Sequence, residues 1–169
     1  GSLNVRDFGA VGDGKTDDTE AVQRALDEAT KGGGGVVWMP RGTYRIAGHL
    51  LVPDNATLQG VWTVPTAWSQ FRGTTLLAEE GRGTEDGPPF ISLALNATIK
   101  GLTIYYPAQE YDNIVPYPWC VGCTGADNPS IVDVLMVNPY KGVDFATNNS
   151  GRHYIRNLYG QPLRMGLRV

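Results

Sequence analysis

Asp144 and Arg168 lie 24 residues apart, and this spacing is informative because the last third of the chain repeats with the same period. If the apolar residues Val143 and Phe145 face a core, Asp144 faces outward. Arg168 then lies beside it in the next repeat and Cys120 in the previous one. Lyase chemistry on an acidic sugar needs a base and a cation, whereas hydrolysis of a glycosidic bond needs two carboxylates. One Asp with one Arg satisfies neither scheme completely. Asp144 and Arg168 are our candidate catalytic residues, and an ordinary cross-strand charge pair is the alternative.

A second candidate site is the tyrosine-rich segment 105–113. Aromatic rings can pack against the apolar faces of sugars, and neighbouring carboxylates can bind sugar hydroxyls. The expected substrate-binding residues are Tyr105, Tyr106, Glu110, Tyr111 and Asp112. The alternative is that these tyrosines pack the loop onto the core while their hydroxyls remain in water. For Trp119 we favour the core.

We expect no metal site. Cys120 and Cys123 form a Cys-X-X-Cys pair, but the second pair that a structural zinc would need is missing, so we interpret them as two small residues in a strand and its turn. The carboxylates of Asp13, Asp17 and Asp18 lack the spacing of a calcium-binding EF-hand loop. Capping and turn formation explain them better.

The elements that would position these residues repeat along the chain. Segments 118–141 and 142–165 align without gaps as short apolar alternations separated by turn residues, and a third copy begins at Gly166. A period of this length is typical of a solenoid, in which each repeat buries its apolar face against its neighbours. Because the repeated elements read as strands, we predict an all-β fold, a right-handed parallel β-helix.

The apolar positions predict two columns of core residues. One column is Leu58, Ile99, Ile131 and Ile155, and the other is Val61, Leu102, Val134 and Leu158. Successive members are separated by 41, 32 and 24 residues. The longer gaps predict loops that project from the stack at 61–73, 79–89 and 105–116, and insertions of this kind commonly build a binding face.

Residues 1–35 form a unit of their own. Helical spacing of apolar residues predicts a helix over 18–30, with Asp17 as N-cap and Glu20 completing a variant capping box. We expect this helix to cap the N-terminal end of a solenoid whose rungs occupy residues 36–169. At the other end Val169 falls in mid-strand without a cap. We therefore expect this edge to be incomplete, and to self-associate or be completed by another chain.

Composition narrows the possible partners. The net charge of -3, without a basic patch, argues against nucleic acid as a main partner. No apolar run approaches the roughly 20 residues that span a bilayer, so we expect no membrane partner. The 22 glycines and 11 prolines suit a fold of many short strands and turns.

The opening segment 4–23, Asn-Val-Arg-Asp-Phe-Gly-Ala-Val-Gly-Asp-Gly-Lys-Thr-Asp-Asp-Thr-Glu-Ala-Val-Gln, resembles the N-terminal signature of the pectate-lyase-like superfamily. Segment 35–44, Gly-Val-Val-Trp-Met-Pro-Arg-Gly-Thr-Tyr, continues the similarity. The group includes polygalacturonases, exo-β-1,3-glucanases, pectate lyase-type domains and some phage tailspikes.

This resemblance implies a right-handed β-helix, a polysaccharide or oligosaccharide as partner, and a secreted or extracellular location. We expect a polysaccharide-processing protein of the glycoside hydrolase or polysaccharide lyase type, without a cofactor, or with calcium if it is a lyase. The alternative is a non-catalytic glycan-binding or structural segment. The sequence lacks the paired aspartates, Gly-His-Gly turn and Arg-Ile-Lys segment of polygalacturonases, so the resemblance names a fold and no particular reaction.

Overall fold

The computed structural model describes residues 2–63 and 71–169. Its elements are mostly short strands. In chain order they are β1 (Ser2–Asn4), the 3-10 helix η1 (Val5–Phe8), β2 (Asp13–Asp17), α1 (Thr19–Lys31), β3 (Gly35–Met39), β4 (Gly42–Ile46), β5 (Leu50–Val52), β6 (Ala56–Gly60), β7 (Thr74–Ala78), β8 (Ile91–Leu93), β9 (Thr98–Tyr105), β10 (Trp119–Cys123), β11 (Ser130–Val137), β12 (Lys141–Asp144), β13 (Tyr154–Gly160) and β14 (Met165–Arg168).

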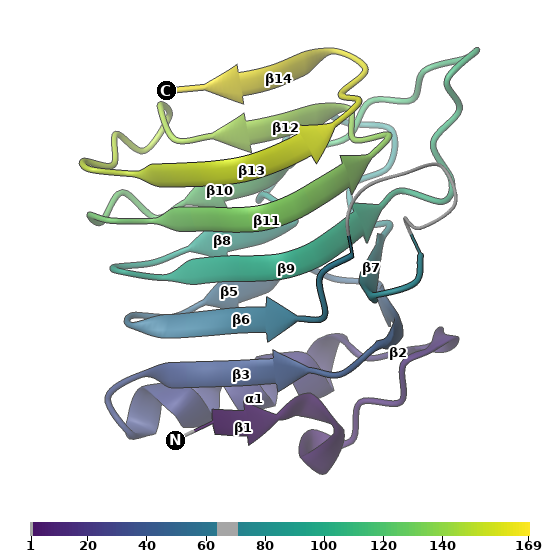
Figure 1. Ribbon diagram of the computed structural model, residues 1–169. Helices are drawn as coiled ribbons and strands as arrows, with labels where there is room; N and C mark the ends of the chain where they lie inside the picture. The colour runs from purple at the N-terminus through teal and green to yellow at the C-terminus, as the bar shows by residue number, and fades with distance from the viewer. Residues whose placement is uncertain (1, 64–70) are drawn as a thin grey trace.

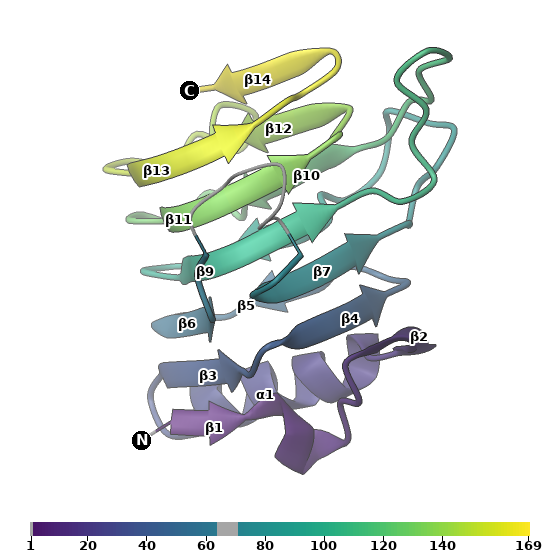
Figure 2. The ribbon, with the colours of Figure 1, turned by 45° about the vertical axis from the view of Figure 1, so that its right-hand side comes forward.

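The strands stack in parallel into two curled sheets that enclose one core (Figures 1 and 2). The larger sheet has the order β1-β3-β6-β9-β7-β4-β2, with β11 and β13 added beyond β9. The second sheet has the order β14-β12-β10-β8-β5. In Figure 1 the chain crosses the front sheet from left to right, returns behind it, and rises toward the C-terminus. The predicted parallel β-helix, with mostly β structure, is confirmed.

The helix α1 lies at the N-terminal end of this stack (Figure 1). Its buried residues, Ala21, Val22, Ala25, Leu26 and Ala29, form the face that contacts β3 and β5. The predicted cap residue was wrong, because the N-cap is Asp18 and not Asp17. The Asp18 carboxylate does not cap the helix. It accepts hydrogen bonds of 2.9 Å from the backbone N–H groups of Val11 and Gly12, and so fixes the preceding loop.

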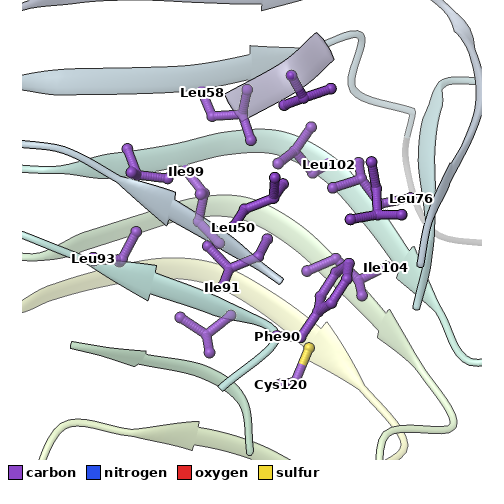
Figure 3. Close-up of a cluster of buried hydrophobic side chains, with 14 of the residues drawn as sticks. Leu50, Leu58, Leu76, Phe90, Ile91, Leu93, Ile99, Leu102, Ile104 and Cys120 are labelled. Atoms are coloured by element: carbon purple, nitrogen blue, oxygen red, sulfur yellow. The ribbon is translucent and has the colours of Figure 1, made fainter. Parts of the chain in front are cut away.

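Backbone register confirms the first core column and most of the second. Leu58 pairs with Ile99, Ile99 with Ile131, and Ile131 with Ile155. Figure 3 shows Leu58, Ile99 and Leu102 among the buried side chains that fill the space between the sheets. In the second column Leu102, Val134 and Leu158 are in register. Val61 is not part of it, because β6 ends at Gly60 and Val61 is only half-buried.

The period of 24 holds for two pairs of strands and fails for a third. It relates β11 to β13 and β12 to β14. In contrast, Val121 pairs with Val143, and Trp119 pairs with Lys141, an offset of 22. The reason is that the path from β12 to β13 is two residues longer than the path from β10 to β11. Cys120 therefore lies in the core, fully buried, and Gly122 takes the place beside Asp144 that we had assigned to it.

The turns of successive coils are also stacked. Asn55, Asn96 and Asn128 adopt left-handed φ angles of 61°, 54° and 61°. The side-chain amide of Asn96 donates to Asn55 at 3.0 Å, and that of Asn128 donates to Asn96 at 2.7 Å. Asparagine tolerates this backbone conformation better than most residues, and the ladder fixes the height of each coil on the next.

The last coil, β13 and β14, carries exposed apolar side chains that include Tyr159 and Leu167. Self-association through this edge stays a prediction. The expected loop at 61–73 lies partly outside the described residues, at 64–70. No helix in the described ranges combines the length and apolar character needed to cross a membrane.

Candidate functional site

A cleft of about 480 Å³ opens on the outer face of the second sheet. Its floor comes from β10 and β12, one wall from the loop between β7 and β8, and the other wall from the turn after β12. Gly122 permits this arrangement, because a Cβ atom at this position would lie 2.6 Å from Cγ of Pro89. The wall loop can thus lie directly against the strand.

The pair Asp144 and Arg168 lies at this cleft as predicted, side by side in parallel register on β12 and β14. Arg168 Nε is 3.6 Å from Asp144 Oδ1, and Arg168 Nη2 donates to the Thr147 hydroxyl at 2.8 Å. The Asp144 side chain is only 7% exposed, whereas that of Arg168 is 49% exposed. Arg168 can therefore contact a ligand without leaving its partner.

Asp144 also organises the turn that follows it. Its Oδ1 atom accepts hydrogen bonds of 3.0 Å from the backbone N–H groups of both Ala146 and Thr147. Burial alone opposes ionisation of this carboxyl group, but these hydrogen bonds and the charge of Arg168 outweigh it and lower its pKa below the usual value. At neutral pH Asp144 is therefore ionised and poorly suited to donate a proton.

Trp119 forms an aromatic surface in the cleft between two cations. The Lys141 ammonium is 5.0 Å from the centre of the ring system and the Arg168 guanidinium carbon is 6.0 Å from it, both within the range of cation–π attraction. We expected Trp119 in the core. It is instead half-buried, because β10 begins at this residue and the ring lines the cleft.

Lys141 and Glu85 are cleft residues that the sequence reasoning missed. Lys141 Nζ lies 3.4 Å from Glu85 Oε1, and the side chains are 12% and 51% exposed. Asp86 from the same loop also lines the cleft. The signal for Lys141 was its alignment with Trp119, which the assumed 24-residue offset concealed. Glu85 lies in a loop outside the repeat, so no periodicity pointed to it.

The tyrosine-rich segment is divided between surface and core. Tyr105 packs against Phe71, with ring centres 5.0 Å apart, and Tyr111 is 77% exposed. Glu110 and Asp112 are also exposed. Tyr106 differs from expectation: it is 2% exposed, because it faces the core and packs against two other aromatic rings. It is therefore not available to a ligand in this conformation.

The loop of residues 106–118 does not line the cleft, but it supports the wall of the cleft from behind. The backbone N–H of Gly83 donates to the Pro116 carbonyl at 2.8 Å, and Arg82 Nε donates to the Ala108 carbonyl at 3.4 Å. Gln109 fixes the loop itself through hydrogen bonds in both directions with the Val115 backbone. The structure thus separates the two predicted groups of site residues, with Asp144 and Arg168 in the cleft and Tyr111 outside it.

The residues of the cleft do not form a metal centre. Within the described ranges, no group of three or more His, Cys, Asp or Glu side chains could hold a metal ion. The carboxylate of Asp144 is already engaged by two backbone N–H groups and Arg168, and that of Glu85 by Lys141. These residues do not fit a calcium ion, which needs six to eight oxygen ligands.

Comparison with known proteins agrees with this fold. The family model of "Rhamnogalacturonase A/epimerase, pectate lyase-like" proteins matches residues 2–168. Alginate lyase 7 of Azotobacter vinelandii is 56% identical over 55 residues, which cover 32% of this chain and 6% of that protein.

Two solved structures share the fold over nearly the whole chain. An exopolygalacturonase from Thermotoga maritima has a TM-score of 0.70 at 17% identity, covering 97% of this chain and 48% of that chain. PfbA, a surface adhesin of Streptococcus pneumoniae, has a TM-score of 0.65 at 21% identity, covering 95% and 39%. This chain thus spans less than half the length of each of these proteins. Together with the match to residues 2–168, the resemblance found in the sequence is confirmed, and the chain belongs to the rhamnogalacturonase A/epimerase, pectate lyase-like family.

Proposed function

We propose that this chain is the glycan-recognising part of a polysaccharide-processing protein of the glycoside hydrolase or polysaccharide lyase type. The observation that carries the proposal is the cleft, in which the ring of Trp119 lies between the cations Lys141 and Arg168. An indole ring packs well against the apolar face of a sugar. Two cations beside it favour a sugar that bears a carboxylate, so we infer that the substrate class is an acidic polysaccharide.

The cleft supports binding more directly than it supports a particular reaction. In a lyase or epimerase, Lys141 and Arg168 would bind the carboxylate of the sugar and a separate base would remove the C5 proton. Asp144 has a lowered pKa and a fixed carboxylate, so it serves better to orient Arg168 than to act as that base. Hydrolysis would need a second carboxylate at a set distance, and Glu85 and Asp86 are the carboxylates that line the same cleft. No step is routed through calcium, because the described carboxylates do not fit it.

The second candidate function is non-catalytic glycan binding, as in a surface or structural protein. One observation favours it: Asp144, the carboxylate best placed in the cleft floor, is committed to holding its own turn. The similarity in fold to a surface adhesin fits this alternative. Under either function we infer a secreted or surface location, where such polysaccharides are found.

We also infer that the coil is right-handed and that α1 caps its first turn. The path of the chain through the front and back sheets supports the handedness, which is also the usual one for parallel crossovers (Figure 1). The packing of the apolar face of α1 against β3 and β5, at the end of the stack, supports the capping role.

Titration calorimetry with acidic and neutral oligosaccharides tests the proposed function. We expect galacturonate or mannuronate oligomers to bind and a neutral laminarin oligomer to bind more weakly or not at all. Trp119→Ala should lower the affinity by about tenfold, equivalent to about 1.4 kcal/mol, while Tyr111→Ala should leave it unchanged. Circular dichroism confirms that both variants are folded. Loss of binding in Tyr111→Ala with normal binding in Trp119→Ala would place the site in the tyrosine-rich loop.

Product analysis then separates an enzyme from a binding protein. Incubation with pectin, alginate and β-glucan, followed by measurement of reducing ends and of unsaturated-uronate absorbance, distinguishes hydrolysis from elimination. Binding without either product supports the non-catalytic alternative for this chain.

A further inference from the structure

We propose that Glu85 is an internal competitor for the acidic ligand: its carboxylate occupies the position beside Lys141 that a sugar carboxylate would take. This inference rests on the proposed function and deepens it, because it names the residue that sets the affinity of the cleft for acidic glycans. Glu85 thereby holds the cleft closed to weakly binding anions and yields to a glycan that also stacks on Trp119.

Lys141 has the properties of an anion-binding group. Its side chain is only 12% exposed, so its ammonium group has lost most of its contact with water. A charged group in such a place needs a counter-charge. The ring of Trp119 supplies part of it at 5.0 Å, and the Glu85 carboxylate supplies the rest at 3.4 Å.

Glu85 has the properties of a partner that can be released. Its side chain is 51% exposed, so its carboxylate is readily hydrated when it leaves Lys141. Ion pairs this open to solvent contribute little to stability, which makes exchange for another carboxylate inexpensive in free energy. The loop that carries Glu85 is held at Gly83 and Thr84 by backbone hydrogen bonds, so a change of the Glu85 rotamer does not require the loop to move.

The second cation of the cleft does not offer the same exchange. Arg168 pairs with Asp144, whose carboxylate is 7% exposed and is fixed by two backbone hydrogen bonds. Displacement of this carboxylate would break the turn after β12. Lys141 is therefore the cation that can change partners, and Arg168 is the cation that can add a second contact to the same ligand.

The test is a double-mutant cycle measured by calorimetry on the full 169-residue chain, with galacturonate and mannuronate oligomers as probes. The variants are Glu85→Gln, Lys141→Met and the two combined. Asp86→Asn is the matched control, because it removes the same charge from the same loop and from the same cleft. A neutral laminarin oligomer controls for changes in stacking alone.

We expect Glu85→Gln to bind the acidic oligomer about two- to fivefold more tightly than the unmodified chain, equivalent to about 0.4–1 kcal/mol. Asp86→Asn should give a smaller gain, Lys141→Met should lose affinity, and Glu85→Gln should give no gain in the Lys141→Met background. Affinity for the neutral oligomer should not change with Glu85→Gln.

Other results overturn the inference. Binding by the unmodified chain with no gain in Glu85→Gln, a gain equal to that of Asp86→Asn, or a gain that persists without Lys141 would each show that Glu85 does not compete for this position. Absence of binding to both acidic oligomers in every variant would overturn the proposed function as well, so the two failures are distinguishable.

Discussion

Replacement of Asp144 tests whether its carboxylate mainly holds the turn of the cleft. Its Oδ1 atom accepts two backbone hydrogen bonds, from Ala146 and Thr147, and lies beside Arg168. Hydrogen bonds to a charged group contribute about 1.5–3 kcal/mol each, and two bonds to one oxygen atom share part of that energy. We expect Asp144→Ala to lower the free energy of unfolding by about 2–4 kcal/mol. Asp144→Asn keeps an oxygen acceptor without the charge, and should cost about 1 kcal/mol.

Urea denaturation followed by circular dichroism measures these differences at neutral pH, with the slope m checked for a change in the unfolding reaction. Asp86→Ala is the control, since it removes an exposed carboxylate from the same cleft and should change stability by less than about 0.5 kcal/mol. Equal costs for Asp144→Ala and Asp144→Asn, or no cost for either, would refute the assignment of these hydrogen bonds.

The pH dependence gives a second measurement on the same residue. The pKa of Asp144 is lower in the folded protein than its usual value, so ionisation stabilises the fold. This contribution is fully present above the pKa of the unfolded chain, about 3.9, and is lost as the pH falls through the lower folded value. The stability difference between the unmodified chain and Asp144→Ala should therefore shrink from about pH 5 downward. A difference that stays constant to pH 3 would show that the charge is not its source.

The fold was predictable because its core repeats in a simple way. The residues of the column Leu58, Ile99, Ile131 and Ile155 recur inside similar short motifs, and only an inward position explains an apolar residue in each. The register of β10 was not predictable by the same means. It depends on the number of residues in the turn after each strand, and the longer turn after β12 is set by the Asp144 hydrogen bonds, which leave no periodic mark.

The site was predictable only where the repeat reached it. Asp144 and Arg168 were placed together because β12 and β14 keep the period of 24. Lys141 was missed through the two-residue slip, and Glu85 because it belongs to a loop outside every repeat. The neighbours Tyr105 and Tyr106 show a further limit. One ring lies against Phe71 and the other in the core, and adjacent residues of one type give no sign of which faces inward.

The remaining predictions concern the core. Ile131→Ala should destabilise the chain by about 2–5 kcal/mol, because Ile131 is fully buried between two coils, and Ile155→Ala by about 1–2 kcal/mol, because Ile155 is only half-buried. A larger cost at Ile155 in urea denaturation would contradict the assigned burial. Cys120 should resist alkylation in the native state, since burial raises the pKa of its thiol to about 12 and the thiolate is the reactive form. Mass spectrometry after iodoacetamide treatment at pH 8 should find Cys120 labelled only when urea unfolds the chain. Rapid labelling without urea would mean that β10 opens readily, and that the floor of the cleft is not the fixed surface on which Trp119 and Lys141 depend.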